Sequence, residues 1–108
     1  MQNSAGTFVV PSVASVTAAA AGAAANMPAD FRVSITNAPG ADAYPIASFT
    51  WVLLYEDPQD KAQAAMMKEF MRWALTDGQK MAPELGYASL PPQVVDMEMK
   101  ALDQLKVQ

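Results

Sequence analysis

Three carboxylates, Glu56, Asp57 and Asp60, form the densest acidic group of the chain. Paired carboxylates can perform acid/base catalysis or hold a hard cation. A calcium loop needs alternating oxygen ligands, and this stretch does not supply them. Asp57 before Pro58 suits the start of a helix, and Asp60 would then lie in the first turn, near the positive end of the helix dipole. We therefore predict that the group caps a helix and holds no metal.

Cysteine and histidine are both absent from the 108 residues. The usual zinc sites, thiol nucleophiles, Ser-His-Asp relays and imidazole bases cannot be built without them. The sequence also lacks the glycine spacing of a dinucleotide loop, the lysine of a P-loop and a G-x-S-x-G nucleophile turn. We predict that the chain is not an enzyme and uses no cofactor, with no catalytic residue of its own.

The charge balance is acidic, with a net charge of -4. Nucleic acid is an unsuitable partner, because its phosphates require clustered Lys and Arg. Lys68 and Arg72 are four residues apart on one predicted helix face, where we expect them to meet Glu69 or solvent. The other basic residues are scattered singly, so spacing alone indicates no anion site.

The sequence predicts no membrane insertion, because no run reaches the roughly 18 apolar residues that a spanning helix needs. Residues 16–29 have the small side chains of a signal-peptide cleavage region. However, no Lys or Arg precedes Arg32, and alanine makes a weak apolar region. We predict that this segment is not a signal peptide, and that any export signal would lie outside the chain.

The first half of the chain predicts two strands and a helix. Apolar residues make up 52% and charged residues 17%, which favours one folded domain over disorder. Residues 7–10 are β-branched or aromatic and end at a proline, and Ser12 then suits the N-cap of an alanine-rich helix over 13–25. Apolar and polar residues alternate over 31–37, which is typical of a half-buried strand.

Residues 49–55 form a continuous apolar run with Thr50 as the only polar interruption. Such a run is typical of a strand covered on both faces, although a buried helix segment would give the same pattern. We prefer the strand, because the run is short and a helix signal follows at once. Residues 51–55 are then expected in the core.

The second half predicts helices. Over 60–75, Met66, Phe70 and Trp73 form an apolar stripe, which we interpret as a core face; the eight methionines of the chain could alternatively line an adaptable binding groove. A shorter helix follows, broken by proline and glycine. The last helix has Ser89 as N-cap candidate and an apolar inner face. Its inward residues are expected to be Val94, Val95, Met99 and Leu102.

Several phrases in fixed order resemble one family: "QNSAGTFVVPS", "FRVSITNAPGADAYPIASFTWVLL", "MMKEFMRWAL" and "LGYASLPPQVV". Together they resemble the C-terminal third of the phosphate-binding proteins of ABC-type phosphate importers. The resemblance covers essentially the whole chain. It implies an α/β fold, here a partial type II periplasmic-binding-protein fold with few strands and helices packed on them.

The resemblance also implies two lobes joined by crossing strands. Residues 1–47 would end the second lobe, with a strand, the alanine-rich helix and a further strand. Residues 48–108 would return into the first lobe, with the crossing strand and the C-terminal helices. The hinge candidates are then Ala47, Ser48, Phe49 and Thr50.

The family holds phosphate with hydroxyls, backbone N–H groups, an Asp and an Arg beside a Ser-Gly-Thr turn, and these motifs lie upstream of the matched region. Arg32 and Arg72 fall in a strand and a helix instead, so no ligand contact is assigned to this chain. The resemblance implies a periplasmic fragment that binds inorganic phosphate, and serves an ABC permease, only with the missing N-terminal part. The alternative is a stand-alone structural or interaction domain, most simply a homodimer, without transport activity.

Overall fold

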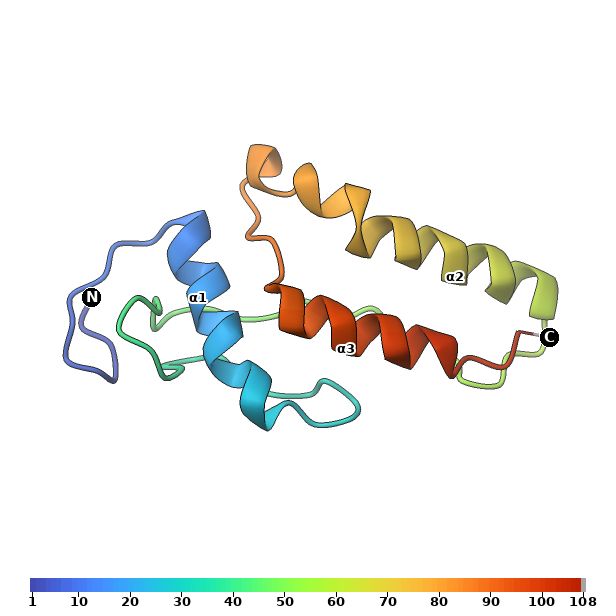
Figure 1. Cartoon of the computed structure of the whole chain (residues 1–108), viewed down its shortest axis with the longest axis horizontal. Coiled ribbons are helices and arrows are strands. Elements are labelled where there is room, and N and C mark those ends of the chain that lie inside the picture. Colours follow the sequence, from blue (N-terminus) through green and yellow to red (C-terminus); the bar gives the residue numbers. More distant parts are fainter. Residues whose placement is uncertain (108) are drawn as a thin grey trace.

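The computed structural model describes residues 1–107. Two groups of elements lie along its long axis (Figure 1). One contains the N-terminal segment, the first helix and a pair of extended segments, and the other contains two antiparallel helices. The helical elements are α1 (Val13–Ala23), η1 (Ala24–Asn26), α2 (Lys61–Leu75), η2 (Asp77–Lys80), η3 (Pro83–Leu85) and α3 (Pro92–Asp103).

Helix α1 begins at a reciprocal cap, as the sequence predicted. The Ser12 Oγ accepts a hydrogen bond from the Ser15 N–H at 3.0 Å, and the Ser15 Oγ accepts one from the Ser12 N–H at 2.9 Å. This capping box satisfies two backbone donors that a helix start leaves unpaired. The helix ends at Ala23, and the predicted last residues form the 3-10 turn η1.

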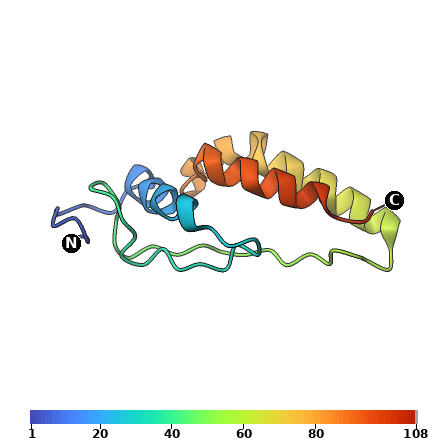
Figure 2. The same cartoon turned by 60° about the horizontal axis from the view of Figure 1, so that its bottom comes forward.

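Residues 32–36 and 45–51 run antiparallel as a pair of extended segments beneath the helices (Figure 2), and Phe31 and Asn37, at the two ends of the first segment, have positive φ. Two hydrogen bonds tie the ends of the pair. The Asn37 N–H donates to the Pro45 carbonyl at 2.7 Å, and the Trp51 Nε1 donates to the Phe31 carbonyl at 2.8 Å. We call this pair the extended hairpin. The expected alternation holds, because Phe31 is half-buried and Ile35 is buried while the polar residues between them are exposed.

The expected strands do not form as ladders within residues 1–107. The described residues contain one isolated antiparallel bridge, between Gln2 and Phe8, so the strand predicted over 7–10 is wrong and the α/β class is not confirmed. The physical reason is the lack of neighbours. A strand is held by inter-strand N–H to C=O bonds, and segments tied only at their ends leave most of these groups unpaired.

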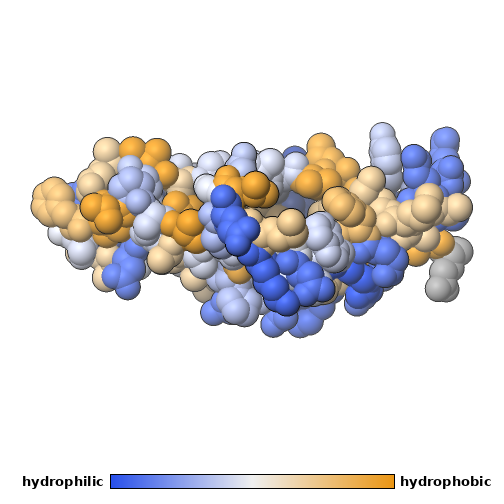
Figure 3. All heavy atoms as spheres, turned by 90° about the horizontal axis from the view of Figure 1, so that it is seen from above, coloured by the Kyte–Doolittle hydropathy of each residue, from blue (hydrophilic) through white to orange (hydrophobic). Residues whose placement is uncertain are grey.

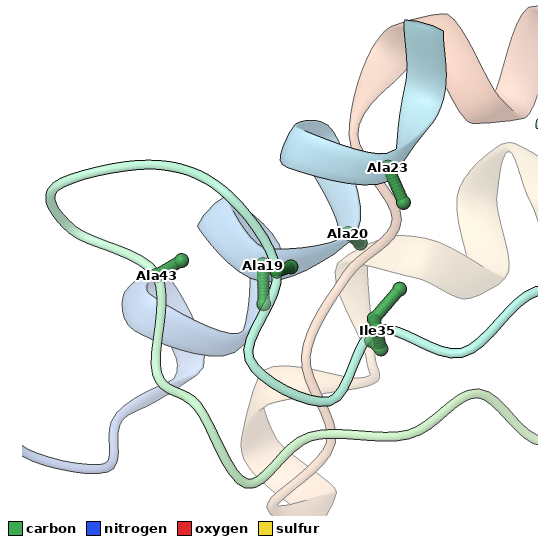
Figure 4. Close-up of a cluster of buried hydrophobic side chains, with 6 residues drawn as sticks. Ala19, Ala20, Ala23, Ile35 and Ala43 are labelled. Carbon is green, nitrogen blue, oxygen red and sulfur yellow. The ribbon is translucent and has the colours of Figure 1, made fainter. Parts of the chain in front are cut away.

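Alanines join α1 to the extended hairpin. Their side chains gather with Ile35, which is 1% exposed, and together they form the alanine core (Figure 4). Its buried members are Ala19, Ala20, Ala23, Ile35, Ala38 and Ala43. Small side chains let the helix approach the backbone closely. At Gly22 an added Cβ would lie well inside van der Waals contact with the Pro39 carbonyl oxygen.

Helices α2 and α3 form an antiparallel pair (Figures 1 and 2). The buried side chains of these two helices are Leu75, Val94 and Leu102, so the predicted inner face of the last helix is confirmed for the latter two. The sequence predicted that α2 and α3 begin after Asp57 and Ser89, and both predictions are wrong. Asp60 caps α2, accepting from the Gln63 N–H at 2.9 Å, and α3 begins after Pro91.

Candidate functional site

A groove of about 1310 Å³ lies beside the elements described above. The extended hairpin and residues 52–56 line one side of it, and α2 and α3 line the other. Representative lining residues are Phe31, Trp51, Leu54, Met71, Val94 and Glu98. Its walls are mainly apolar, so its chemistry suits an apolar or extended polypeptide better than a free anion.

Residues 47–55, which we call the arm, run from the alanine core to the start of α2 (Figure 2). The prediction that 51–55 lie in the core is wrong: Leu53 is 89% exposed and Tyr55 is 85% exposed, and Trp51 and Val52 are exposed as well. The run does have the extended form that its apolar pattern favoured. It lacks the covering layers that would bury it, because the helices reach only its groove side.

The apolar stripe on α2 is also exposed, so the core prediction for Met66, Phe70 and Trp73 is wrong. Figure 3, seen from the α2 side of the molecule, shows apolar side chains at several places with polar ones between them. Helix α2 packs against α3 through its opposite side, where Leu75 is buried. One neighbour can cover one side only, and the stripe stays exposed although Trp73 lies beside Gly78 of η2.

The hinge candidates all lie in the first part of the arm. Ala47 and Phe49 are half-buried and pack against the alanine core, whereas Ser48 and Thr50 are exposed. The Ser48 hydroxyl donates to the Phe49 carbonyl at 3.1 Å. These residues therefore connect the α1 region to the α2 and α3 pair, and the alternation of inward and outward side chains is that of an extended strand.

The carboxylates predicted to cap a helix are spread around the start of α2. The sequence predicted Asp57 as the N-cap of α2, but the N-cap is Asp60. Asp57 pairs instead with Lys61, and the hydrogen bond from this ammonium lowers the pKa of the Asp57 carboxyl. Glu56 contributes its backbone carbonyl, which accepts from the Lys106 N–H at 2.8 Å. Each role is local and structural.

Both arginines are engaged by carboxylates of the chain. The backbone N–H of Arg32 donates to the Asp30 Oδ1 at 3.1 Å, and the Arg32 Nε donates to the Asp30 Oδ2 at 2.8 Å. These two hydrogen bonds, the backbone one first, hold the pKa of the Asp30 carboxyl below its usual value. Arg72 meets Glu69 at 3.7 Å, as predicted, and also pairs with Asp103 of α3, which sequence reasoning missed. Each guanidinium therefore already shares its charge with a carboxylate, Arg32 through its Nε alone.

Glu98 is a groove residue that sequence reasoning missed. It is half-buried on α3, and burial raises the pKa of its carboxyl above the ordinary value of 4.5. A signal was present in the sequence. Glu98 lies four residues from both Val94 and Leu102, so it shares the inner face of the helix with two buried apolar residues.

Within residues 1–107, no three His, Cys, Asp or Glu side chains gather as they would to hold a metal ion. The longest helix there, α2, has 15 residues, and no helix combines the length and the apolar character required to cross a membrane.

Comparison with known proteins points to one kind of relative. No family model matches the chain. The phosphate-binding protein PstS of Xylella fastidiosa strain 9a5c is 41% identical over 95 residues, which cover 88% of this chain and 26% of that protein. The chain is homologous to a segment of PstS. The PstS of Methanocaldococcus jannaschii is 33% identical over 120 residues, which cover 98% of this chain and 30% of the relative.

A third PstS, from Haemophilus influenzae, is 36% identical over 95 residues and again matches 88% of the chain. The resemblance drawn from the residues is therefore confirmed. The chain spans between 26% and 30% of the length of these curated relatives, so it matches only part of each PstS.

Proposed function

We propose that the chain contributes one segment of the phosphate-binding component of an ABC-type phosphate importer in the periplasm. The observation that carries this proposal is the 41% identity to PstS over 88% of the chain. Inorganic phosphate would be the ligand, and an ABC permease would be the partner. This chain would take part in both interactions only together with the rest of a PstS-like polypeptide.

The pairing of the two arginines supports phosphate binding by residues outside this chain. A phosphate dianion is bound by converging backbone N–H groups, hydroxyls and arginine forks. Arg32 and Arg72 are instead paired with carboxylates. The phosphate ligands would therefore come from the remainder of the polypeptide, while this chain would supply residues 47–50 as a hinge between the part that ends at 47 and the part that follows.

A chimera tests the proposal. The matching segment of the Xylella PstS is replaced by this chain, and phosphate binding is measured by titration calorimetry. We expect saturable phosphate binding that sulfate does not compete away. A chimera that is folded by circular dichroism and yet takes up no phosphate would overturn the proposal.

A second candidate, a stand-alone interaction domain that forms a homodimer, is favoured by a different observation. The arm and the α2 stripe expose large apolar side chains that a second copy could cover. Light scattering on the isolated chain separates the two candidates. A stable dimer with no role in phosphate binding would favour the second.

A further inference from the structure

The α1 region, which is residues 1–46, shares little apolar packing with the pair formed by α2 and α3. The alanine core and the half-buried side chains packed against it all lie within residues 19–49, so the core contains no residue of α2 or α3. The groove of about 1310 Å³ lies between the extended hairpin and the two helices. Helix α1 does contact α3, near the N-terminal end of α3 in both cartoons (Figures 1 and 2). The relative orientation of the two groups therefore depends on few contacts.

One hydrogen bond crosses the junction between the two groups. The Thr17 Oγ1 of α1 donates to the Ser89 carbonyl, in the loop before α3, at 2.7 Å, and both residues are half-buried. Within residues 1–107 it is the only hydrogen bond that joins residues 1–46 directly to residues 56–107. The ion pairs found there stay within residues 30–32 or within residues 57–103. A single polar contact thus links the α1 region to the two helices.

The acceptor of this bond is held in place by Gln79 of η2. The Gln79 Oε1 accepts from the Leu90 N–H at 2.7 Å, and the Gln79 carbonyl accepts from the Ser89 Oγ at 3.0 Å. The Gln79 Nε2 donates to the Ala74 carbonyl of α2 at 3.1 Å. Residues 89 and 90 are therefore tied to the C-terminal end of α2, and the Ser89 carbonyl faces α1 from a fixed position.

The donor of the bond has an alternative partner. A threonine hydroxyl inside a helix can bond to the carbonyl four residues earlier in its own helix, which for Thr17 is that of Val13. In the structure the hydroxyl bonds to Ser89 instead. Because one neutral hydrogen bond is exchanged for another or for water, it shifts an equilibrium by only about two- to tenfold. Such a contact is strong enough to favour one orientation and weak enough to open.

We propose that the hydrogen bond between Thr17 and Ser89 is a latch that holds the α1 region in one orientation relative to the α2 and α3 pair. The two groups would turn about residues 47–50, whose backbone N–H groups donate no hydrogen bond within residues 1–107. Hinges are a few such residues that absorb changes in φ and ψ. This inference rests on the proposed function for the hinge and adds the contact that controls it. A latch of this kind would tune affinity, because a ligand binds only the fraction of molecules in the competent orientation.

Spin-label distances in the full chain test the latch. The chain contains no cysteine, so two introduced cysteines carry the labels. Asp42→Cys labels the α1 region and Lys100→Cys labels α3, and both positions are exposed. The turn around Asp42 is fixed by the Asn3 side chain, which donates to the Ala43 carbonyl at 3.1 Å. We expect one narrow distance distribution, measured by double electron–electron resonance in the dilute chain. A broad distribution in this parent chain would show that no latch holds the two groups.

Substitutions at the donor give the decisive comparison. Thr17→Val removes the hydroxyl and keeps a branched side chain, so the population outside the main distance should increase two- to tenfold while the helix content by circular dichroism stays unchanged. Thr17→Ser keeps the hydroxyl and should reproduce the parent. Thr36→Val makes the same change at an exposed position of the extended hairpin and should also reproduce the parent. The latch is wrong if Thr17→Val matches the parent, or if either control broadens the distribution as much.

Gln79→Ala tests the acceptor side and leaves α1 unchanged. It removes the partner of the Leu90 N–H, so the same outlying population should increase at least twofold. Combined with Thr17→Val it should add nothing, because both changes act through one hydrogen bond. Additive effects would contradict the latch. A second label pair, Met66→Cys with Lys100→Cys, lies within α2 and α3 and should keep its distribution in every variant. A change in that pair would place the effect inside the two helices and overturn the proposal.

The outcomes separate this inference from the proposed function, because the distance measurement requires no phosphate. A chain that loses its orientation with Thr17→Val, while the chimera with the Xylella PstS binds no phosphate, supports the latch and counts against the phosphate role. A chimera that binds phosphate, together with distances that Thr17→Val leaves unchanged, supports the phosphate role and overturns the latch.

Discussion

The alanine core and the arm use apolar residues in opposite ways. The alanine core buries five alanines and Ile35 between α1 and the extended hairpin. The arm exposes Leu53 and Tyr55, which are much larger. The molecule thus buries its small apolar side chains and leaves many of its large ones in water.

This difference in burial indicates whether each region packs within the chain or against another polypeptide. Alanine methyl groups contribute little area each, but they let α1 approach the hairpin backbone closely and complete the packing within the chain. The arm and the α2 stripe carry side chains that would contribute much more on burial, and most of the large ones stay exposed here. The first region is complete within the described residues, whereas the second is suited to an interface.

Ile35→Ala should have the largest effect. Ile35 is the one large side chain of the alanine core, and its removal leaves a cavity that the surrounding alanines are too short to fill. We expect a loss of about 2 to 5 kcal/mol in the free energy of unfolding, measured by urea denaturation. A loss below about 1 kcal/mol would show that the alanine core is not closed around Ile35.

Gly22→Ala should come next. In a helix interior this change normally stabilises by up to about 1 kcal/mol, but here the new Cβ would meet the Pro39 carbonyl oxygen, which belongs to the backbone. We expect a net destabilisation of about 1 to 3 kcal/mol. Ala21→Gly at the exposed neighbouring position is the control and should cost about 1 kcal/mol from propensity alone. Stabilisation by Gly22→Ala would contradict the close approach.

Local signals in the sequence predicted the elements of the alanine core well. Ser12 as a cap, the alanine run and the alternation over residues 31–36 each depend on neighbours a few residues away, and the structure agrees with all three. The positions of Asp60 and Pro91 as caps were missed by two or three residues, because several polar residues and prolines nearby suit the same role.

Burial of the arm could not be predicted in the same way. A continuous apolar run indicates that a segment will be covered, and it does not say which polypeptide covers it. Phe70 and Trp73 on α2 show the same limit, since helical spacing identifies the apolar side and not its neighbour. The pairing of Arg72 with Asp103 was missed because the two residues meet only once α2 and α3 pack together.

Glu98→Gln should have a smaller effect that depends on pH. The folded-state pKa of Glu98 is raised, so below the ordinary value of 4.5 the carboxyl is neutral in both states and the two proteins should be equally stable. As pH rises through the raised pKa, the folded state binds more protons than the unfolded state and stability falls. The variant should therefore unfold at a higher temperature than the parent at pH 7.5. Equal melting temperatures at pH 4 and pH 7.5 for both proteins would show that the groove does not desolvate this carboxyl.

Leu53→Ala should have the smallest effect on the free chain, and it is the closest match to Ile35→Ala. Leu and Ile are branched aliphatic side chains of similar size, and both changes shorten them to the methyl group of alanine. However, Leu53 is 89% exposed and Ile35 is 1% exposed. Little area returns to water at Leu53, so we expect a change within about 0.5 kcal/mol in the same urea denaturation. A loss of 2 kcal/mol or more in the dilute, monomeric chain would mean that the arm is already buried in solution. It would then belong to the core, as its apolar sequence first indicated, and would offer no surface for a partner.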